Sequence, residues 1–257
     1  MKEVLAIRRK LLVANWKMHK NISEAQAFCR RFLPEIEECD RADIAICPPF
    51  TLLTAVKGAL GSSKVKLGAQ NLFWEEKGAY TGEVSPAMLL DAGCEMVIIG
   101  HSERRHIFGE TDEMINRKVK AALRNKLIPI LCVGETLEER KKGQAEEVVK
   151  RQLLEGLREL EYDGEIVIAY EPVWAIGTGV NASPDDAQKM SFFIRQILKG
   201  IFPEEKVLEM RILYGGSVKP ENITGFTGQP DVDGALVGGA SLDPDSFAEI
   251  VRLSCYA

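Results

Sequence analysis

The sequence lacks long hydrophobic runs and blocks of like charge. The apolar run near its start is interrupted by Asn15 and Lys17, so it is too short for a signal sequence or a membrane span. The 33 basic and 38 acidic residues are mixed along the chain, without the basic stripe typical of nucleic-acid binding. We therefore expect no membrane and no nucleic-acid partner, while local positive charge still allows a small anionic ligand.

Metal-binding and dinucleotide-binding motifs are also missing. His101 and His106 are two of only three histidines, and an interval of five does not place them on one helix face, which disfavours a metal pair. No G-x-G-x-x-G follows the first apolar run. We predict that the protein uses no metal and no cofactor.

The cysteines form no recognisable framework. There are six, without a C-x-x-C pair or the spacing of a disulfide scaffold: Cys29, Cys39, Cys47, Cys94, Cys132 and Cys255. Most lie in apolar stretches, where a free cysteine behaves as a small hydrophobic residue. This pattern fits free thiols in a reducing compartment, and we predict a cytoplasmic protein.

Eight short apolar runs recur along the chain with helical segments between them. They are Leu11–Trp16, Asp43–Cys47, Val65–Ala69, Met96–Ile99, Ile128–Val133, Ile166–Tyr170, Ile212–Tyr214 and Gly234–Val237. Near-continuous hydrophobicity is typical of strands buried on both faces of a parallel sheet. Eight strand–helix units in 257 residues predict a single α/β domain with a (β/α)8 barrel, and an open doubly wound sheet is the rival.

Capping residues locate several helix starts. Ser23 followed by Gln26 has the spacing of a capping box. Other starts are marked by a cap residue before a proline or before acidic residues: Ser85, Thr111, Ser183 and Asp243. The run Ala145–Leu160 is predicted as an amphipathic helix.

The active site of such a barrel lies at the carboxyl ends of its strands. Polar residues and glycines follow five of the predicted strands: Asn15 and Lys17, His101, Glu171, Gly215 to Ser217, and Gly238 with Gly239. One Gly-Gly pair alone is most simply a tight turn. Two such turns at adjacent strand ends favour a phosphate site, because glycine lets backbone N–H groups approach an anion closely.

The candidate side chains also have ordinary interpretations. Lys17 could be a solvated lysine and Glu171 a structurally paired carboxylate. Their positions directly after buried strands favour roles that face a substrate. For His101, the residues alone leave a structural and a functional role equally open.

The segment Pro172–Ala182 predicts a lid over this site. It carries Trp174 and Ile176, while Gly177 and Gly179 supply both mobility and backbone donors. The alternative is a loop that packs on the barrel rim.

Seven stretches together resemble the triosephosphate isomerase family. In order they are Asn15–Met18, Gly68–Asn71, Ile99–Arg105, Leu131–Glu135, Ala169–Gly179, Tyr214–Val218 and Gly238–Ser241. The resemblance runs from about Arg9 to the end. It implies one TIM-barrel catalytic domain over residues 1–257, with residues 1–8 a short N-terminal extension. It also implies interconversion of dihydroxyacetone phosphate and D-glyceraldehyde 3-phosphate through an enediolate, in glycolysis and gluconeogenesis.

The resemblance also implies residue roles. Glu171 would be the base that removes a proton from carbon, and His101 a neutral imidazole acting as electrophile at the oxygens. Lys17 and Asn15 would stabilise developing negative charge. The phosphate would be gripped through backbone N–H groups at Gly177, Ser217, Gly238 and Gly239.

Two details of the lid region can be compared with the family. Val180 and Asn181 stand where the family commonly has Lys-Thr, at the trailing hinge, which puts closing kinetics rather than chemistry in question. Cys132 resembles a family cysteine near the glutamate, and we interpret it as packing support rather than as a nucleophile.

The Gln70–Ser85 stretch predicts a subunit interface. It is long and carries apolar side chains at Leu72, Phe73, Trp74 and Tyr80, and an exposed loop of this kind usually has a partner surface. In the family this loop inserts into a second subunit, with the residue that matches Thr81 reaching the neighbour's site. We predict a homodimer, and a tetramer is also compatible.

Two other functions fit the same residues. One is a Schiff-base aldolase acting on a phosphosugar, with Lys17 as nucleophile, which borohydride trapping would detect. The other is a non-catalytic barrel that binds phosphoanions, which leaves Glu171 beside Lys17 and His101 without a purpose. The fold alone does not separate them.

Overall fold

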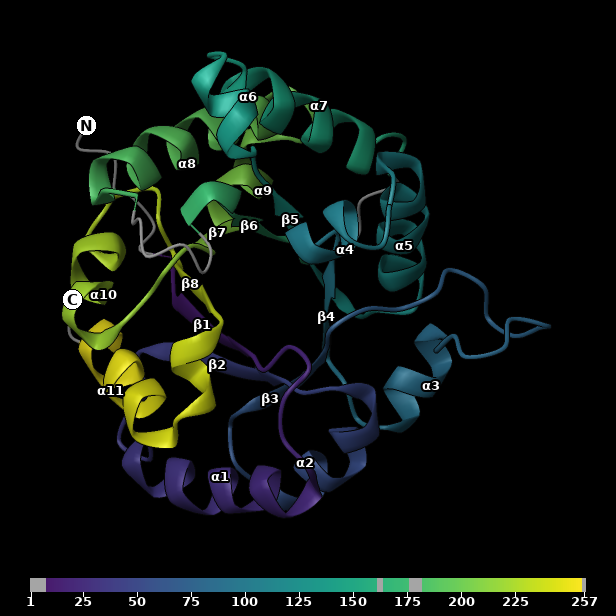
Figure 1. Cartoon of the computed structure of the whole chain (residues 1–257), viewed down its shortest axis with the longest axis vertical. Helices are drawn as coiled ribbons and strands as arrows, with labels where there is room; N and C mark the ends of the chain where they lie inside the picture. The colour runs from purple at the N-terminus through teal and green to yellow at the C-terminus, as the bar shows by residue number, and fades with distance from the viewer. Residues whose placement is uncertain (1–7, 161–163, 176–181, 256–257) are drawn as a thin grey trace.

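Eight parallel strands close into a barrel that helices surround on all sides (Figure 1). The computed structural model describes residues 8–160, 164–175 and 182–255. The strands follow one another in sequence order around the barrel, and β8 pairs with β1 to close it. This confirms the predicted (β/α)8, or TIM, barrel and excludes the open doubly wound sheet.

All eight predicted apolar runs are strands, and each end lies within one residue of its prediction. The strands are β1 (Lys10–Asn15), β2 (Ala42–Cys47), β3 (Lys66–Ala69), β4 (Met96–Ile99), β5 (Ile128–Val133), β6 (Val167–Tyr170), β7 (Arg211–Tyr214) and β8 (Gly234–Val237). Alternate residues face opposite sides: Leu11 and Val13 pack inside the barrel, whereas Leu12 and Ala14 pack against the helices. Burial on both faces explains why the strands are apolar throughout.

Helices connect successive strands and form the outer layer. They are α1 (Ile22–Glu35), α2 (Leu53–Leu60), α3 (Pro86–Asp91), α4 (Ser102–His106), α5 (Asp112–Arg124), α6 (Leu137–Lys141), α7 (Ala145–Gly156), α8 (Pro184–Lys199), α9 (Glu204–Glu209), α10 (Pro220–Thr227) and α11 (Pro244–Cys255). The predicted caps of α3, α5, α8 and α11 accept backbone N–H groups of the first helical turn: Ser85, Thr111, Ser183 and Asp243. None of the helices in the described ranges is long and apolar enough to cross a membrane.

Two predicted helix ends are wrong. The capping box of α1 is formed by Asn21 and Glu24, whose side chains each accept the other residue's backbone N–H at 3.0 and 2.8 Å. Ser23 lies in the first turn and donates to Asn21. Helix α7 ends at Gly156, short of the predicted Leu160.

The amino-terminal end of the barrel is tied together by ion pairs. Arg8 Nε lies 2.7 Å from an Asp233 carboxylate oxygen, and the other oxygen of Asp233 accepts from Arg195 at 3.0 Å. Both acid and bases are largely buried, so these pairs are screened less by solvent than surface pairs are. Arg8 is therefore anchored on the barrel, and residues 1–7 of the predicted extension lie outside the described residues.

The expectation of six free thiols is wrong for one pair. Cys39, which precedes β2, is joined by a disulfide to Cys255 at the end of α11, across 216 positions of sequence. Four cysteines are unpaired and buried: Cys29, Cys47, Cys94 and Cys132. Cysteine spacing gives no sign of this pairing, because only barrel closure brings the first and last units together.

Candidate active site

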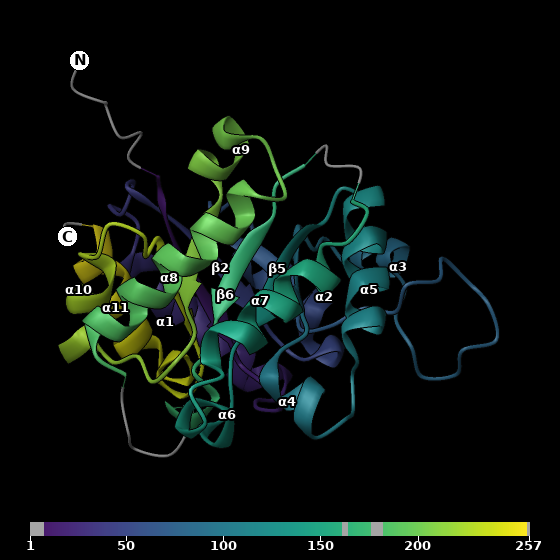
Figure 2. The ribbon, with the colours of Figure 1, turned by 90° about the horizontal axis from the view of Figure 1, so that it is seen from above.

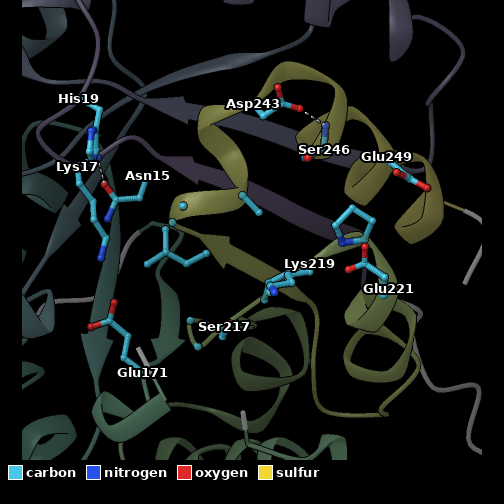
Figure 3. Close-up of a pocket in the computed structure, with 18 of the residues that line it drawn as sticks. Asn15, Lys17, His19, Glu171, Ser217, Lys219, Glu221, Asp243, Ser246 and Glu249 are labelled. Atoms are coloured by element: carbon cyan, nitrogen blue, oxygen red, sulfur yellow. Dashed lines mark hydrogen bonds between the residues drawn. The ribbon is translucent and has the colours of Figure 1, made fainter. Parts of the chain in front are cut away.

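A cavity of about 760 Å³ lies at the carboxyl ends of the strands. All the predicted site residues that the structure describes line it: Asn15, Lys17, His101, Glu171, Ser217, Gly238 and Gly239. In Figure 3 the side chains of Lys17 and Glu171 extend toward each other, with Ser217 on the neighbouring side of the cavity. Gly177, the remaining predicted phosphate ligand, lies outside the described residues. Five strand ends, those of β1, β4, β6, β7 and β8, therefore present their polar groups to one cavity.

Glu171 follows β6 directly and is only 2% exposed. One carboxylate oxygen accepts the Ser102 backbone N–H at 2.8 Å, and the other lies 3.0 Å from His101 Nε2. Burial opposes ionisation of this carboxyl, but His101, by its charge whenever the ring is protonated and by its hydrogen bond, together with the Ser102 N–H outweighs burial and lowers the pKa of Glu171. The side chain is therefore held in its ionised, basic form.

His101 caps the amino terminus of α4 with its ring. Its Nδ1 accepts the Glu103 backbone N–H at 3.2 Å, so the proton of the neutral ring is on Nε2, which faces Glu171. Burial disfavours the imidazolium, but the Glu171 carboxylate outweighs burial and raises the pKa of His101. The backbone donor at Nδ1 acts against protonation, since a protonated Nδ1 could not accept it. This arrangement selects the tautomer that donates from Nε2 into the cavity.

Lys17 has a backbone conformation that is unusual for a residue with a side chain. Its φ is 50°, in the left-handed region, which costs about 1–3 kcal/mol. Asn15 Oδ1 accepts the Lys17 N–H at 3.0 Å, and Gln70 Nε2 donates to the Lys17 carbonyl at 2.8 Å. The ammonium group donates to Glu103 at 2.7 Å. Asn15 and Gln70 thus hold the strained turn that aims Lys17 into the cavity.

The turns after β7 and β8 form the cradle predicted for a phosphate, which we define as Ser217, Gly238 and Gly239. Asn222 Nδ2 donates to the Ser217 carbonyl at 3.1 Å and fixes the first turn. A side chain at Gly238 would lie 3.4 Å from Lys17 Cε, so the cradle lies next to the lysine. A phosphate in the cradle would therefore contact backbone donors and an ammonium group together.

Two glycines make room for Glu171. A Cβ at Gly134 would lie 1.7 Å from the Glu171 carbonyl oxygen, and one at Gly215 would lie 2.8 Å from Glu171 Cγ. The sequence suggested a phosphate turn for Gly215 and no role for Gly134 beyond the family motif. Glycine is required at both positions because a Cβ at either one would overlap backbone or side-chain atoms of Glu171.

The start of the predicted lid packs on a buried carboxylate. Glu135 is fully buried after β5 and accepts the Trp174 indole N–H at 2.8 Å and the Tyr170 hydroxyl at 3.1 Å. Arg140 lies over the Trp174 ring at 4.5 Å and also pairs with Glu135. Residues 176–181, which include the lid glycines, Val180 and Asn181, lie outside the described residues, so the lid stays a prediction.

Cys132 lies behind the glutamate as the sequence suggested. It is completely buried, and burial raises the pKa of its thiol well above the ordinary value. A thiol in this state is not nucleophilic, which agrees with packing support.

Comparisons with known proteins agree with this geometry. The family model described as triosephosphate isomerase matches residues 10–254. The chain belongs to the triosephosphate isomerase family. It is 56% identical over 253 residues to the triosephosphate isomerase of Symbiobacterium thermophilum, covering 98% of this chain and 99% of that protein. It is 53% identical to the protein of the same name from Dictyoglomus thermophilum and 55% identical to that from Moorella thermoacetica, each over 248 residues and 96% of this chain.

Family membership also decides between the enzyme classes. A triosephosphate isomerase family barrel is an isomerase, which argues against the Schiff-base aldolase and the non-catalytic barrel.

Proposed function

We propose that this isomerase interconverts dihydroxyacetone phosphate and D-glyceraldehyde 3-phosphate, with Glu171, His101, Lys17 and Asn15 as its catalytic residues. The observation that carries the proposal is that a buried carboxylate, an imidazole, an ammonium group and the phosphate cradle border one cavity. A three-carbon phosphate held in the cradle would present its reacting carbons to Glu171. No cofactor is needed for this chemistry, which moves only protons.

The Glu171 carboxylate removes a proton from the carbon next to the carbonyl. A carboxylate of ordinary pKa, about 4.3, is a weak base toward a C–H bond, and the pKa of Glu171 is lowered further. The step therefore depends on stabilising the oxygen that becomes negatively charged in the enediolate. A proton then moves from one oxygen of the enediolate to the other, with His101 between them. The carboxylic acid of Glu171 finally gives its proton, or one exchanged from solvent, to the adjacent carbon.

Lys17 and His101 supply the donors for the enediolate. An ammonium group has three N–H donors, so Lys17 keeps its bond to Glu103 while it donates to the substrate. His101 donates from Nε2, the nitrogen that faces Glu171 in the absence of substrate. Asn15 lines the cavity beside Lys17 and fixes its turn, which preorganises the positive charge.

The cradle and the lid hold the intermediate in place. Backbone N–H groups of Ser217, Gly238 and Gly239, joined by that of Gly177, bind the phosphate. Closure of Pro172–Ala182 excludes water, which strengthens the hydrogen bonds to the enediolate and slows loss of its phosphate. Val180 and Asn181 at the trailing hinge alter how fast the lid moves rather than the chemistry.

Turnover in deuterium oxide tests the proposal. Coupled assays in both directions should show interconversion without an added metal or cofactor, and product recovered early should carry solvent deuterium on carbon, because a carboxylic acid exchanges its proton. Binding of triose phosphate without turnover would instead support the anion-binding barrel. A borohydride-stable adduct on Lys17 would support the aldolase.

We also propose that the enzyme is a homodimer assembled through the Gln70–Ser85 loop. This loop extends away from the barrel (Figure 2), and the Phe73 ring packs in tilted contacts against Trp74 and Tyr80, with ring centroids 4.1 and 4.6 Å apart. Tyr80 is 45% exposed, and Met18 next to the site is 93% exposed, so both apolar surfaces lack cover in one chain. Of the four apolar side chains predicted to be exposed, only Tyr80 is: Leu72 is fully buried in the core, and Phe73 and Trp74 are partly buried.

Size measurement of loop variants tests the dimer. Wild type should elute as a dimer, or a tetramer, at micromolar concentration, and Tyr80→Asp should dissociate it because a carboxylate would be buried at the interface. Phe192→Asp changes an aromatic residue of similar exposure on α8 and should leave the assembly intact. A wild-type monomer would refute the proposal.

For the whole chain we propose one catalytic domain over residues 1–257 and a cytoplasmic location. The barrel occupies the family match from residue 10 to 254, and Arg8 is anchored to it. The four unpaired cysteines fit a reducing compartment, whereas the Cys39–Cys255 disulfide is of a kind that is uncommon there. Cell fractionation that follows the enzyme's activity tests the location.

A further inference from the structure

Helix α11 connects the active-site end of the barrel to its opposite end. Asp243 and Ser246, at its beginning, line the active-site cavity, and Cys255 ends it. The disulfide joins Cys255 to Cys39 in the connection between α1 and β2, with the two Cα atoms 6.3 Å apart, within the usual disulfide range. The last helix is thereby linked covalently to the first strand–helix unit.

The two sulfur atoms differ in access. Cys39 lines a groove of about 710 Å³, whereas Cys255 is 5% exposed and belongs to the buried core between strands and helices. Two basic and two acidic residues also line this groove: Arg9, Lys64, Glu37 and Asp43. Arg9 pairs with Asp43 at 2.6 Å, so the charges around the groove are balanced and access is set by the opening at Cys39. A small thiol therefore reaches the disulfide from the Cys39 side.

The remaining cysteines offer no comparable site. All four are buried, and burial raises the pKa of Cys29 to about 11 and that of Cys94 to about 12. These thiols remain protonated at neutral pH and react slowly with oxidants or disulfides. Within the described part of the chain, thiol–disulfide chemistry is thus confined to Cys39 and Cys255.

We propose that Cys39–Cys255 is a reversible thiol–disulfide site, reduced by small thiols through this groove, which sets the heat resistance of the barrel without changing its catalysis. A thiolate attacks Cys39 Sγ, the S–S bond breaks, and Cys255 leaves as a thiolate that takes up a proton. A second thiolate then attacks the sulfur of the reductant, which releases Cys39. The protein gains two electrons and two protons, and the reductant becomes a disulfide. A low-molecular-weight disulfide reverses both steps.

The position of the bond explains why stability and activity respond differently. The bond closes a loop across 216 positions, so it restricts the unfolded chain strongly. Helix α11 has 12 residues, which places its two ends about 16 Å apart at 1.5 Å per residue. The folded helix stays packed on α1 and α10 when the bond is reduced, so the cavity keeps its shape.

Full-length enzyme equilibrated with oxidised or reduced dithiothreitol tests the proposal. Thiol titration in denaturant should give four thiols in the oxidised form and six in the reduced form, and peptide mapping should assign the bond to Cys39 and Cys255. Reduction should lower Tm by about 5–15 °C, because a disulfide that closes a long loop raises the Tm of a domain of this size by about that amount. At 25 °C, the kcat values of the oxidised and reduced enzyme should agree within about twofold, because the reacting groups lie at the other end of the barrel from the disulfide.

Variants separate the bond from packing. Cys39→Ser and Cys255→Ser should each lose the difference in Tm between the two buffers, whereas Cys29→Ser should keep it even if its own Tm is lower. Six thiols after treatment with oxidised dithiothreitol would overturn the proposal. So would equal Tm values for oxidised and reduced wild type, or a redox difference that persists in Cys39→Ser.

Discussion

Replacing Glu171 by aspartate removes one methylene from the base and leaves its charge unchanged. The carboxylate retreats by about 1.5 Å, one carbon–carbon bond. Its contacts of 2.8 Å to the Ser102 N–H and 3.0 Å to His101 Nε2 are then lost in the free enzyme. In the substrate complex a reacting distance of about 3–3.5 Å becomes about 4.5–5 Å, and misplacement by 1 Å alone costs a factor of about 100.

We therefore expect kcat to fall by a factor of about 100–1000, which corresponds to about 3–4 kcal/mol of transition-state stabilisation. KM should change by less than about threefold, because the phosphate is bound by Ser217, Gly238 and Gly239 rather than by the base. The assay couples dihydroxyacetone phosphate formation to its reduction by a dehydrogenase.

Glu221→Asp is the matched control. Glu221 borders the same cavity from α10 and has no assigned part in the reaction, so its shortening should leave kcat nearly unchanged. A fall in kcat of less than tenfold for Glu171→Asp, or an effect mainly on KM, would refute the reasoning, because the carboxylate would then not be the group that takes the proton from carbon.

Three further predictions concern the surroundings of the base. Gly134→Ala forces the Glu171 backbone to move, because the new Cβ would lie 1.7 Å from the Glu171 carbonyl oxygen. We expect it to cost about 2 kcal/mol or more of stability and to lower kcat at least tenfold. An unchanged Tm and kcat would contradict the close approach. His101→Gln removes the partner that most strongly lowers the pKa of Glu171. The acid limb of the kcat–pH profile should therefore move to higher pH, and kcat should fall about 100-fold. An acid limb that stays in place would show that His101 does not interact with the base. Lys17→Met should lower kcat and raise KM together, because Lys17 lies between the enediolate and the cradle; a change in KM alone, measured in the same coupled assay, would assign it to phosphate binding only.

The sequence predicted the strands closely because their burial on both faces leaves a continuous apolar run. It also placed Asn15, Lys17, His101 and Glu171 at one end of the barrel, since each lies within two residues of the carboxyl end of a strand and parallel strands end at the same side. These predictions needed only the local pattern and the topology.

Features that depend on contacts between distant segments were not predictable in this way. Gly134 is required only because the Glu171 backbone passes 1.7 Å from where its Cβ would be. The disulfide depends on closure between the first and last units. The capping box of α1 was misplaced for a local reason: Asn21–Glu24 and Ser23–Gln26 share the same spacing, and only the backbone conformation shows which pair is used.

The central claim is that the Glu171 carboxylate and the phosphate cradle act on the same small molecule. A crystal structure of the enzyme with a stable phosphorylated carboxylate that mimics the enediolate tests it most directly. We predict the phosphate on the N–H groups of Ser217, Gly238 and Gly239, the mimic's oxygens within hydrogen-bond distance of Lys17 and His101, and a Glu171 oxygen about 3–3.5 Å from the carbon that stands for the reacting centre. A phosphate bound elsewhere, or a Glu171 side chain directed away from the ligand in the closed complex, would contradict the account.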